Sequence, residues 1–485
     1  MKYSNYIKAF VLSFVVLTIH GCNEDALTQT PDHVISEDLV INSVDKLQNL
    51  LTGSYNEIST GEYLGRVLYK RAAVKSPDFR FVKTIYNPRD YEQTEYRYEE
   101  SSNNNGSAEL LWLKCYKVIG NLNLILDNID DAEGNDDVRQ QIKAEALGLR
   151  GMVYFDLART FAYPWAKEQG SAQGLPLKLK SDEVVIERSS LEETYAQITS
   201  DLKLSLESLG PDSFTQGSTK YVTQLGVKAL LARVYLYQQD WATALTYAQE
   251  VLDQKDENDL MTPENYVFND YTTESLFELS VESENSVGSN GLGAQFDFRD
   301  GGQGDVIATQ TFVDLLQEYT GDPRTQLLTQ DKEETSQAFV KYVNREGGAG
   351  LSIHNISIIR LSEIFLIAAE ACANGAGGGE SEALMYLNTL IQKRTTDFDA
   401  HSASESGEEL KDRIAEERRK EMALEGHGVY DFIRTGRPII RPESDHVNTG
   451  INVNNLNAEA FSAKTIYPIP ASEVEASGMQ QTEGY

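Results

Sequence analysis

Cysteine is scarce in this sequence, since its 485 residues include only three. Three cysteines cannot build a disulfide framework, so stability must come from packing. Positive charge is also in short supply, because 43 Lys and Arg residues face 75 Asp and Glu residues and leave a net charge of −32. Such a chain repels a phosphate backbone, and no Lys/Arg cluster offers a local exception, so nucleic-acid binding is excluded.

Long apolar runs are equally rare. The longest begins at Ala9 and ends at Ile19, and as a helix it would span only ~16 Å against a hydrocarbon core of ~30 Å. Lys2 and Lys8 precede it, which is the arrangement of a secretory signal peptide rather than of a membrane-spanning helix. No later segment approaches ~18 consecutive apolar residues.

The apolar run ends in Ile19-His20-Gly21-Cys22, which resembles a bacterial lipobox. The resemblance predicts that residues 1–21 are removed as a lipoprotein signal peptide and that Cys22 is acylated. Several acyl chains on Cys22 would hold the protein durably on a membrane that it does not cross. The alternative is a secreted soluble protein in which Cys22 has no special role.

Apolar residues recur at helical spacing along much of the chain, which predicts a mainly α fold. Cys115 lies on one such stripe with Val118, Ile119 and Leu122, and Cys372 lies on a second stripe that begins at Leu361. Both cysteines are therefore expected in the core rather than at a catalytic or metal site.

Several of the predicted helices come in adjacent pairs. Residues 225–252 contain two helices separated by a polar break at 238–240, and residues 361–394 repeat the arrangement around a glycine-rich break. Further pairs are predicted from 110–130 with 143–162 and from 191–209 with 222–237. Small residues where two helices cross are typical of tetratricopeptide-like repeats, of which we predict about four units.

Two segments, 76–106 and 256–358, lack helical periodicity and carry Pro, Gly, Asn and many Tyr residues. They are predicted to be loops with short strands, and loops of this length usually serve binding. Because no Gly/Ser-rich or Pro-rich linker divides the chain, residues 22–485 are predicted to form a single domain.

Familiar catalytic motifs are missing. There is no HExxH, GxSxG or GxxxxGK[ST] motif, so the sequence predicts no catalytic residue, no metal site and no cofactor.

Three weaker patterns also fail to identify a site. Glycines 288, 291 and 293 lack the spacing of a dinucleotide-binding motif and predict a flexible loop. The acidic stretch 253–259 could hold calcium, but it lacks the EF-hand glycine and closing glutamate, which favours a solvated helix end. A glycosidase carboxylate pair can be neither supported nor excluded by counting acidic residues.

The C-terminal part carries two long motifs, IAEERRKEMALEGHGVYDFIRTGRPI at 414–439 and IYPIPASEVEASGMQQTEGY at 466–485. They resemble the C-terminal pattern of the SusD/RagB family, and segments 110–129, 142–165, 229–245 and 358–371 also fall in the family's order. Gly428, where an arginine is common, and the ending at 481–485 depart from the pattern. The helical spacing of Glu417, Arg418, Glu421 and Glu425 predicts i, i+4 ion pairs on this helix and a structural role, with Asp431 and Arg434 tying back the next segment.

The resemblance implies a SusD-like helical scaffold and a function. Members of this family are surface lipoproteins of the outer membrane that capture oligosaccharides, or in some cases peptides. They pass the ligand to a SusC-like TonB-dependent barrel transporter without cleaving it. The rival hypothesis is a surface-anchored glycoside hydrolase.

Sugar binding needs flat apolar ring faces with hydrogen-bonding groups around them. Two segments, residues 76–98 and 293–305, offer such residues as candidate ligand contacts. The opposing interpretation is that Tyr96 and Tyr98 alternate as strand residues do, and that Phe296 and Phe298 anchor their loop to the core. The candidates are Tyr86, Arg89, Tyr91, Tyr96 and Tyr98 in the first segment, and Phe296, Phe298 and Arg299 in the second.

Overall fold

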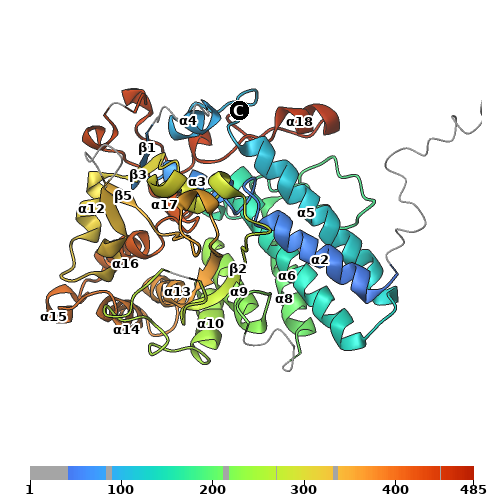
Figure 1. Ribbon diagram of the computed structural model, residues 1–485, viewed down its shortest axis with the longest axis horizontal. Helices are drawn as coiled ribbons and strands as arrows, with labels where there is room; N and C mark the ends of the chain where they lie inside the picture. Colours follow the sequence, from blue (N-terminus) through green and yellow to red (C-terminus); the bar gives the residue numbers. More distant parts are fainter. Residues whose placement is uncertain (1–41, 83–89, 211–217, 269, 331–336, 448) are drawn as a thin grey trace, which may run out of the picture. The chain divides into compact units, whose positions relative to one another are not determined.

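The described part of the chain consists mainly of helices, with a few short strands (Figure 1). The computed structural model describes residues 42–82, 90–210, 218–268, 270–330, 337–447 and 449–485. Residues Ser43–Tyr485 form one compact unit. The helices are α2 (Val44–Ile58), α3 (Val67–Val74), α4 (Asp90–Tyr96), α5 (Ala108–Asn128), α6 (Asp136–Phe161), α7 (Trp165–Glu168), α8 (Leu191–Ser208), α9 (Gln224–Tyr237), α10 (Trp241–Leu252), α11 (Leu292–Phe296), α12 (Gln310–Leu316), α13 (Leu361–Ala373), α14 (Glu380–Gln392), α15 (Phe398–His401), α16 (Gly407–Glu421), α17 (Gly428–Arg434) and α18 (Ala471–Ser477). The strands are β1 (Phe79–Phe81), β2 (Ser275–Leu279), β3 (Val306–Ala308), β4 (Leu328–Gln330), β5 (Gln337–Phe339) and β6 (Ile356–Arg360).

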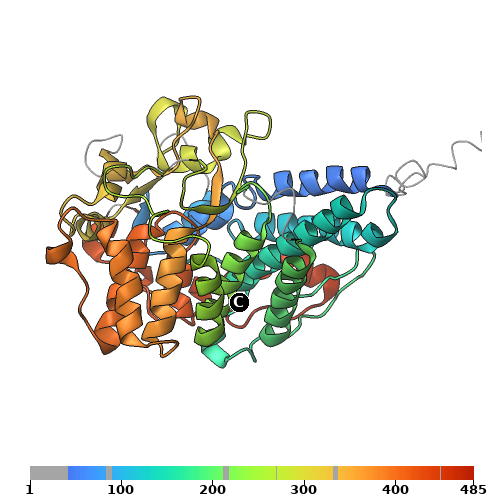
Figure 2. The same cartoon turned by 90° about the horizontal axis from the view of Figure 1, so that it is seen from below.

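The long helices of the described residues pack in pairs: α2 with α5, α6 with α8, α9 with α10, and α13 with α14. The pairs also contact one another, and Figure 2 shows the green helices α9 and α10 beside the orange helices α13 and α14. This confirms the mainly α, tetratricopeptide-like fold. The predicted pairs 110–130 with 143–162 and 191–209 with 222–237 are confirmed too, since α5 packs on α6 and α8 packs on α9, although α6 packs more extensively still on α8.

Two glycines explain why α6 lies so close to its neighbours. A Cβ added at Gly148 would lie 2.7 Å from Val222 Cγ1, and one added at Gly151 would lie 3.0 Å from Leu202 Cγ on α8. Any larger residue would push these elements apart. The predicted polar break is also confirmed, since α10 begins after Asp240, whose carboxylate accepts a hydrogen bond of 3.1 Å from the Thr243 amide.

Three short antiparallel strand pairs lie in the two segments that interrupt the array: β1 with β3, β2 with β6, and β4 with β5. The short strands were predicted, but two local predictions were wrong. Tyr96 is the last residue of α4 rather than part of a strand. Residues 288–296 form a 3₁₀ turn and α11 instead of a flexible loop, because Leu292 and Phe296, four residues apart, are both buried.

Both cysteines within the described residues are buried. Cys115 and Cys372 each expose 0% of their surface, which confirms that they are core residues. Cys22 and residues 1–21 lie outside the described residues. No helix in the described part of the chain is both long and apolar enough to span a bilayer.

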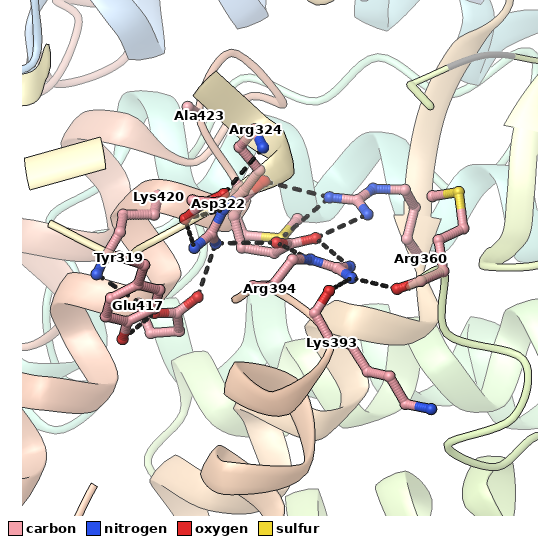
Figure 3. Close-up of polar contacts among 12 residues, drawn as sticks. Tyr319, Asp322, Arg324, Arg360, Lys393, Arg394, Glu417, Lys420 and Ala423 are labelled. Carbon is pink, nitrogen blue, oxygen red and sulfur yellow. Dashed lines mark hydrogen bonds and ion pairs between the residues drawn. The ribbon is translucent and has the colours of Figure 1, made fainter. Parts of the chain in front are cut away.

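The core around α16 contains a network of buried ions (Figure 3). At its centre, the Glu421 carboxylate accepts hydrogen bonds from three arginines: Arg324 at 3.1 Å, Arg360 at 3.0 Å and Arg394 at 2.9 Å. Arg324 also bonds Glu417 at 2.7 Å. These side chains are at most 3% exposed, so each charge depends on its partners rather than on water.

The C-terminal charged motif is therefore structural, but the predicted i, i+4 pairs within it were wrong. On α16, Glu417 and Glu421 point inward, where most of their partners come from distant parts of the chain: the 3₁₀ turn before β4, strand β6 and the residue after Lys393. The expected tie to the next segment is confirmed, because Arg418 bonds Asp431 at 2.8 Å and Asp431 bonds Arg434 at 2.8 Å.

Charge pairing decides the ionisation of this network. Burial alone would raise the pKa of Glu417, but Arg324 and Lys420 outweigh it and hold that pKa at about 2. Burial likewise opposes ionisation of Glu421, yet Arg394 and Arg360 keep its pKa well below the ordinary value. Both carboxylates are thus charged at neutral pH, and each arginine that contacts them has a carboxylate as its counter-ion.

Candidate ligand-binding face

Strands β1 and β3 bring the two candidate ligand segments side by side. Phe79 pairs with Ala308 and Phe81 with Val306, and the Val82 amide donates a 2.8 Å hydrogen bond to the Asp305 carbonyl. The first segment continues beyond β1, and the second leads into β3. Two stretches far apart in the sequence therefore meet at one place, which we call the β1–β3 junction: residues 79–82 and 297–305 with the adjoining turns 288–290 and 347–352.

The first candidate segment is only partly described. Tyr86 and Arg89 lie outside the described residues, and Tyr91 lies in α4 at a position where the side chain is not described. Tyr96 is fully buried, and its hydroxyl lies 2.6 Å from His446 Nδ1. Tyr98 is buried and donates a 2.7 Å hydrogen bond to the Lys75 carbonyl. The rings of Tyr96 and Tyr98 are thus packed inside the protein, which favours their structural interpretation.

In the second segment, one aromatic is buried and one reaches the surface. Phe296 is 1% exposed, with its ring centre 6.4 Å from that of Tyr342. Phe298 is half-buried, and Arg299 is exposed with its guanidinium 2.7 Å from the Asp297 carboxylate. Of the described candidates, only Phe298 and Arg299 can therefore contact a ligand.

Glycines let three turns of the junction pack closely around these two residues. A Cβ at Gly350 would lie 2.8 Å from the Gly301 carbonyl oxygen, and one at Gly304 would lie 2.6 Å from Phe298 Cβ. Gly304 also has a φ of +59°, a conformation that glycine adopts without strain. The turns are thus held against each other by backbone contact.

Hydrogen bonds fasten the same turns. The Gln303 amide group donates to the Ser289 carbonyl at 2.8 Å, and the Gln295 amide group donates to the same oxygen at 3.0 Å. Lys70 Nζ on α3 donates to Gln295 at 2.6 Å. The loop surface is therefore anchored to the helical part beneath it, which limits the entropy that ligand binding would have to overcome.

Sequence reasoning missed most polar residues on this surface. Ser289 and Asn290 are exposed there, and Leu351 is 47% exposed. These residues were not predicted, because none of them lies in a segment rich in aromatic residues, whereas the exposed Asp300 directly follows the predicted Phe298 and Arg299. The available signal was the repeated clustering of glycines near 288–293, 301–304 and 347–350. With Phe298 and Arg299, these residues offer a ring and several hydrogen-bonding groups.

The junction has no evident means of holding a metal. Within the described residues, no group of three or more His, Cys, Asp or Glu side chains is arranged to bind a metal ion. The acidic stretch 253–259 uses part of its charge locally, because Asp259 pairs with Lys255 at 2.9 Å. What the junction offers is non-covalent recognition through one ring, one guanidinium, the Asp300 carboxylate and neutral polar groups.

Comparison with known proteins identifies the family of this chain. A family described as "Starch-binding associating with outer membrane" matches residues 25–236, and one described as "SusD family" matches residues 246–485. A Bacteroides vulgatus protein of known structure is 30% identical, with a TM-score of 0.80 over 92% of this chain and 99% of that one. The chain belongs to the SusD/RagB family.

Other relatives match over most of their length. SusD-like protein P2 of Formosa agariphila is 24% identical, over 99% of this chain and all of the relative. A SusD-like carbohydrate-binding protein from Bacteroides vulgatus is 26% identical, with a TM-score of 0.71 over 83% of this chain and 85% of that one.

Proposed function

We propose that this SusD/RagB protein is a nutrient-binding lipoprotein of the cell surface that captures oligosaccharides. It delivers them to a SusC-like TonB-dependent transporter in the outer membrane. Family membership along nearly the whole chain carries the proposal. A relative named as carbohydrate-binding supports the choice of ligand class, and the peptide-binding role of RagB-like proteins is the alternative.

The β1–β3 junction is the proposed capture surface. Phe298 offers a ring face to the apolar side of a sugar, while Arg299 and Asp300 provide hydrogen-bonding groups beside it. The Asp297 carboxylate bonds both the Arg299 guanidinium and the Arg299 amide at 2.9 Å, which orients the side chain before a ligand arrives. Tyr86 and Tyr91 remain proposed contacts from the neighbouring segment.

Membrane attachment is proposed to occur through acylated Cys22. Replacing Cys22 by alanine should move the protein from the membrane fraction to the soluble fraction, since no other predicted feature anchors the chain. Retention of the Cys22→Ala variant on washed membranes would contradict the anchor.

A binding assay with product analysis tests the function. The purified mature protein is titrated with starch, xylan, pectin and peptide mixtures, and each mixture is then examined for new reducing ends and free peptides. Retention of a polysaccharide without shortening is the expected result. Binding of peptides alone would favour the RagB-like alternative, and new reducing ends would favour a hydrolase. A pull-down with a SusC-like transporter tests the proposed partnership.

A further inference from the structure

A second cleft, separate in its residues from the β1–β3 junction, lies where the end of α8, the beginning of α9 and the start of β2 meet. It has a volume of about 570 Å³. Residues 211–217, which connect α8 to α9, lie outside the described residues, and the cleft is defined here without them. Its lining residues are Gly210, Ser218, Thr219, Lys220, Thr223, Gln224, Leu225, Gln254, Lys255, Tyr271, Thr272, Ser275 and Leu276.

The lining is unusual for so acidic a protein, because it includes two lysines and no carboxylate. The rest of its polar groups are hydroxyls and side-chain amides, which suit the hydroxyl groups of a sugar. Another cleft, lined by Trp241 and Phe432, has equal numbers of acidic and basic side chains. Its cations are already matched, as in the 2.6 Å contact between Arg437 and Asp412.

Of the two lysines, Lys220 is the one available to a ligand. Lys255 is paired with Asp259 at 2.9 Å, whereas Lys220 has no carboxylate within ion-pair distance among the described residues. Glu282, a carboxylate that acts on the Lys220 charge through space, has its own partner in Arg345 at 2.9 Å. A charge that is half-buried in a cleft wall without a counter-ion attracts an anionic group.

Tyr271 places a ring beside this charge. Its side chain is 39% exposed, and Lys220 Nζ lies 4.7 Å from the ring centre. Tyr271 has a φ of +56°, which is uncommon for a residue with a side chain. The Tyr271 hydroxyl lies 3.0 Å from Ser280 Oγ. The Lys220 ammonium group therefore lies over the Tyr271 ring at the cleft.

One buried carboxylate holds the wall in place. Glu278 Oε1 accepts hydrogen bonds from the Tyr271 amide at 2.8 Å, the Thr219 hydroxyl at 3.1 Å and the Ser275 hydroxyl at 3.1 Å. Glu278 is 4% exposed, so its charge is directed to these three donors behind the wall. Three lining residues are thus positioned before any ligand binds, which lowers the entropy lost on binding.

We infer that this cleft binds a sugar residue that carries an acidic group, a carboxylate or a sulfate, with its ring on Tyr271 and its anion on Lys220. The inference rests on the proposed function for the ligand being a glycan, and it adds the charge of that glycan. It also makes the cleft a second contact site on the chain, which would increase the avidity for a long polysaccharide that spans both sites.

Affinity electrophoresis of the mature protein in gels that contain pectin, a carboxylated polysaccharide, or carrageenan, a sulfated one, tests the inference. Starch and laminarin serve as neutral counterparts. We expect Lys220→Gln and Tyr271→Ala each to weaken binding to an acidic polysaccharide about tenfold, as is typical of losing one charged or stacking contact. Tyr271→Phe, which keeps the ring, and Lys180→Gln, which removes an exposed lysine elsewhere, should bind as the parent does.

The outcomes separate the two proposals. If the Lys220→Gln and Tyr271→Ala variants lose affinity for pectin alone, the anionic group that the cleft binds is a carboxylate. If they lose affinity for carrageenan alone, it is a sulfate. If the protein binds only neutral polysaccharides, or if neither variant weakens its binding to an acidic polysaccharide, the inferred acidic-sugar site is wrong. The proposed capture of oligosaccharides would still hold. No binding to any polysaccharide overturns oligosaccharide capture itself. A thermal melt of each variant separates loss of contact from loss of fold, with Tyr271→Phe as the conservative reference.

Discussion

The buried network around α16 and the β1–β3 junction use the same residue types in opposite ways. In the network, arginines and carboxylates meet in the interior and satisfy one another, as Arg394 and Glu421 do at 2.9 Å. At the junction, Arg299 is paired on one side and open to solvent on the other. The contrast teaches that a charged motif in a sequence indicates stability or recognition only once its burial is known.

The largest expected effect comes from breaking the network. Glu421→Gln should lower the free energy of unfolding by about 3–5 kcal/mol, because it leaves three buried arginines without their common counter-ion. Urea unfolding monitored by circular dichroism measures the change. Glu409→Gln, at an exposed position on the same helix, should change stability by less than about 0.5 kcal/mol. Equal effects of the two substitutions would show that the network does not hold the fold.

A pair of glycine substitutions tests whether close packing matters in the helical array. Gly148→Ala should destabilise the protein by about 1–3 kcal/mol, because its Cβ would overlap Val222. Gly120→Ala on α5 meets no atom within 4 Å and should stabilise the protein by about 0.4–1 kcal/mol. If the unfolding midpoints of both variants shift in the same direction, the packing argument is wrong.

Acid should weaken the network. The pKa of Glu417 is about 2 in the folded protein, against an ordinary value of 4.5. The unfolded chain therefore takes up the proton first, and stability falls as the pH drops from about 4.5 toward 2. Between pH 7 and pH 3, the parent should lose about 2 kcal/mol more than Glu417→Gln, which cannot titrate there. Unfolding curves of both proteins at the two pH values check this difference, and parallel losses would refute it.

The smallest expected effect lies at the junction. Phe298→Ala should lower affinity for the bound oligosaccharide by about 1–2 kcal/mol, by analogy with aromatic contacts elsewhere, and should barely change the melting temperature. Phe296→Ala, two residues away but buried, should do the reverse and cost about 3–5 kcal/mol of stability. Calorimetric titration and a thermal melt on the same variants compare them.

If Phe298→Ala binds as tightly as the parent, Tyr86 and Tyr91 are the next residues to replace by alanine. A loss of affinity of about tenfold with an unchanged melting temperature would place the ring face on that segment. If all three variants retain parental affinity, the junction is not the capture surface.

Local periodicity accounts for what the sequence predicted well. The stripe through Cys115 and the turn at 238–240 depend on contacts within a few residues, and both appear as expected. Tyr96 and Tyr98 could not be assigned in this way. Each is buried through a contact with a distant or non-periodic partner, and His446, the partner of Tyr96, is 350 residues away.

By itself, the sequence determined the helical class, the repeated pairs and the family, because side-chain spacing and short motifs are local properties that one chain displays directly. The tertiary structure alone decided which aromatics reach solvent, which carboxylates on α16 meet which arginines, and that the segments around 80 and 300 adjoin. These are long-range relations, set by how distant elements pack. No local pattern specifies them, since burial depends on what covers a residue rather than on its neighbours in the chain.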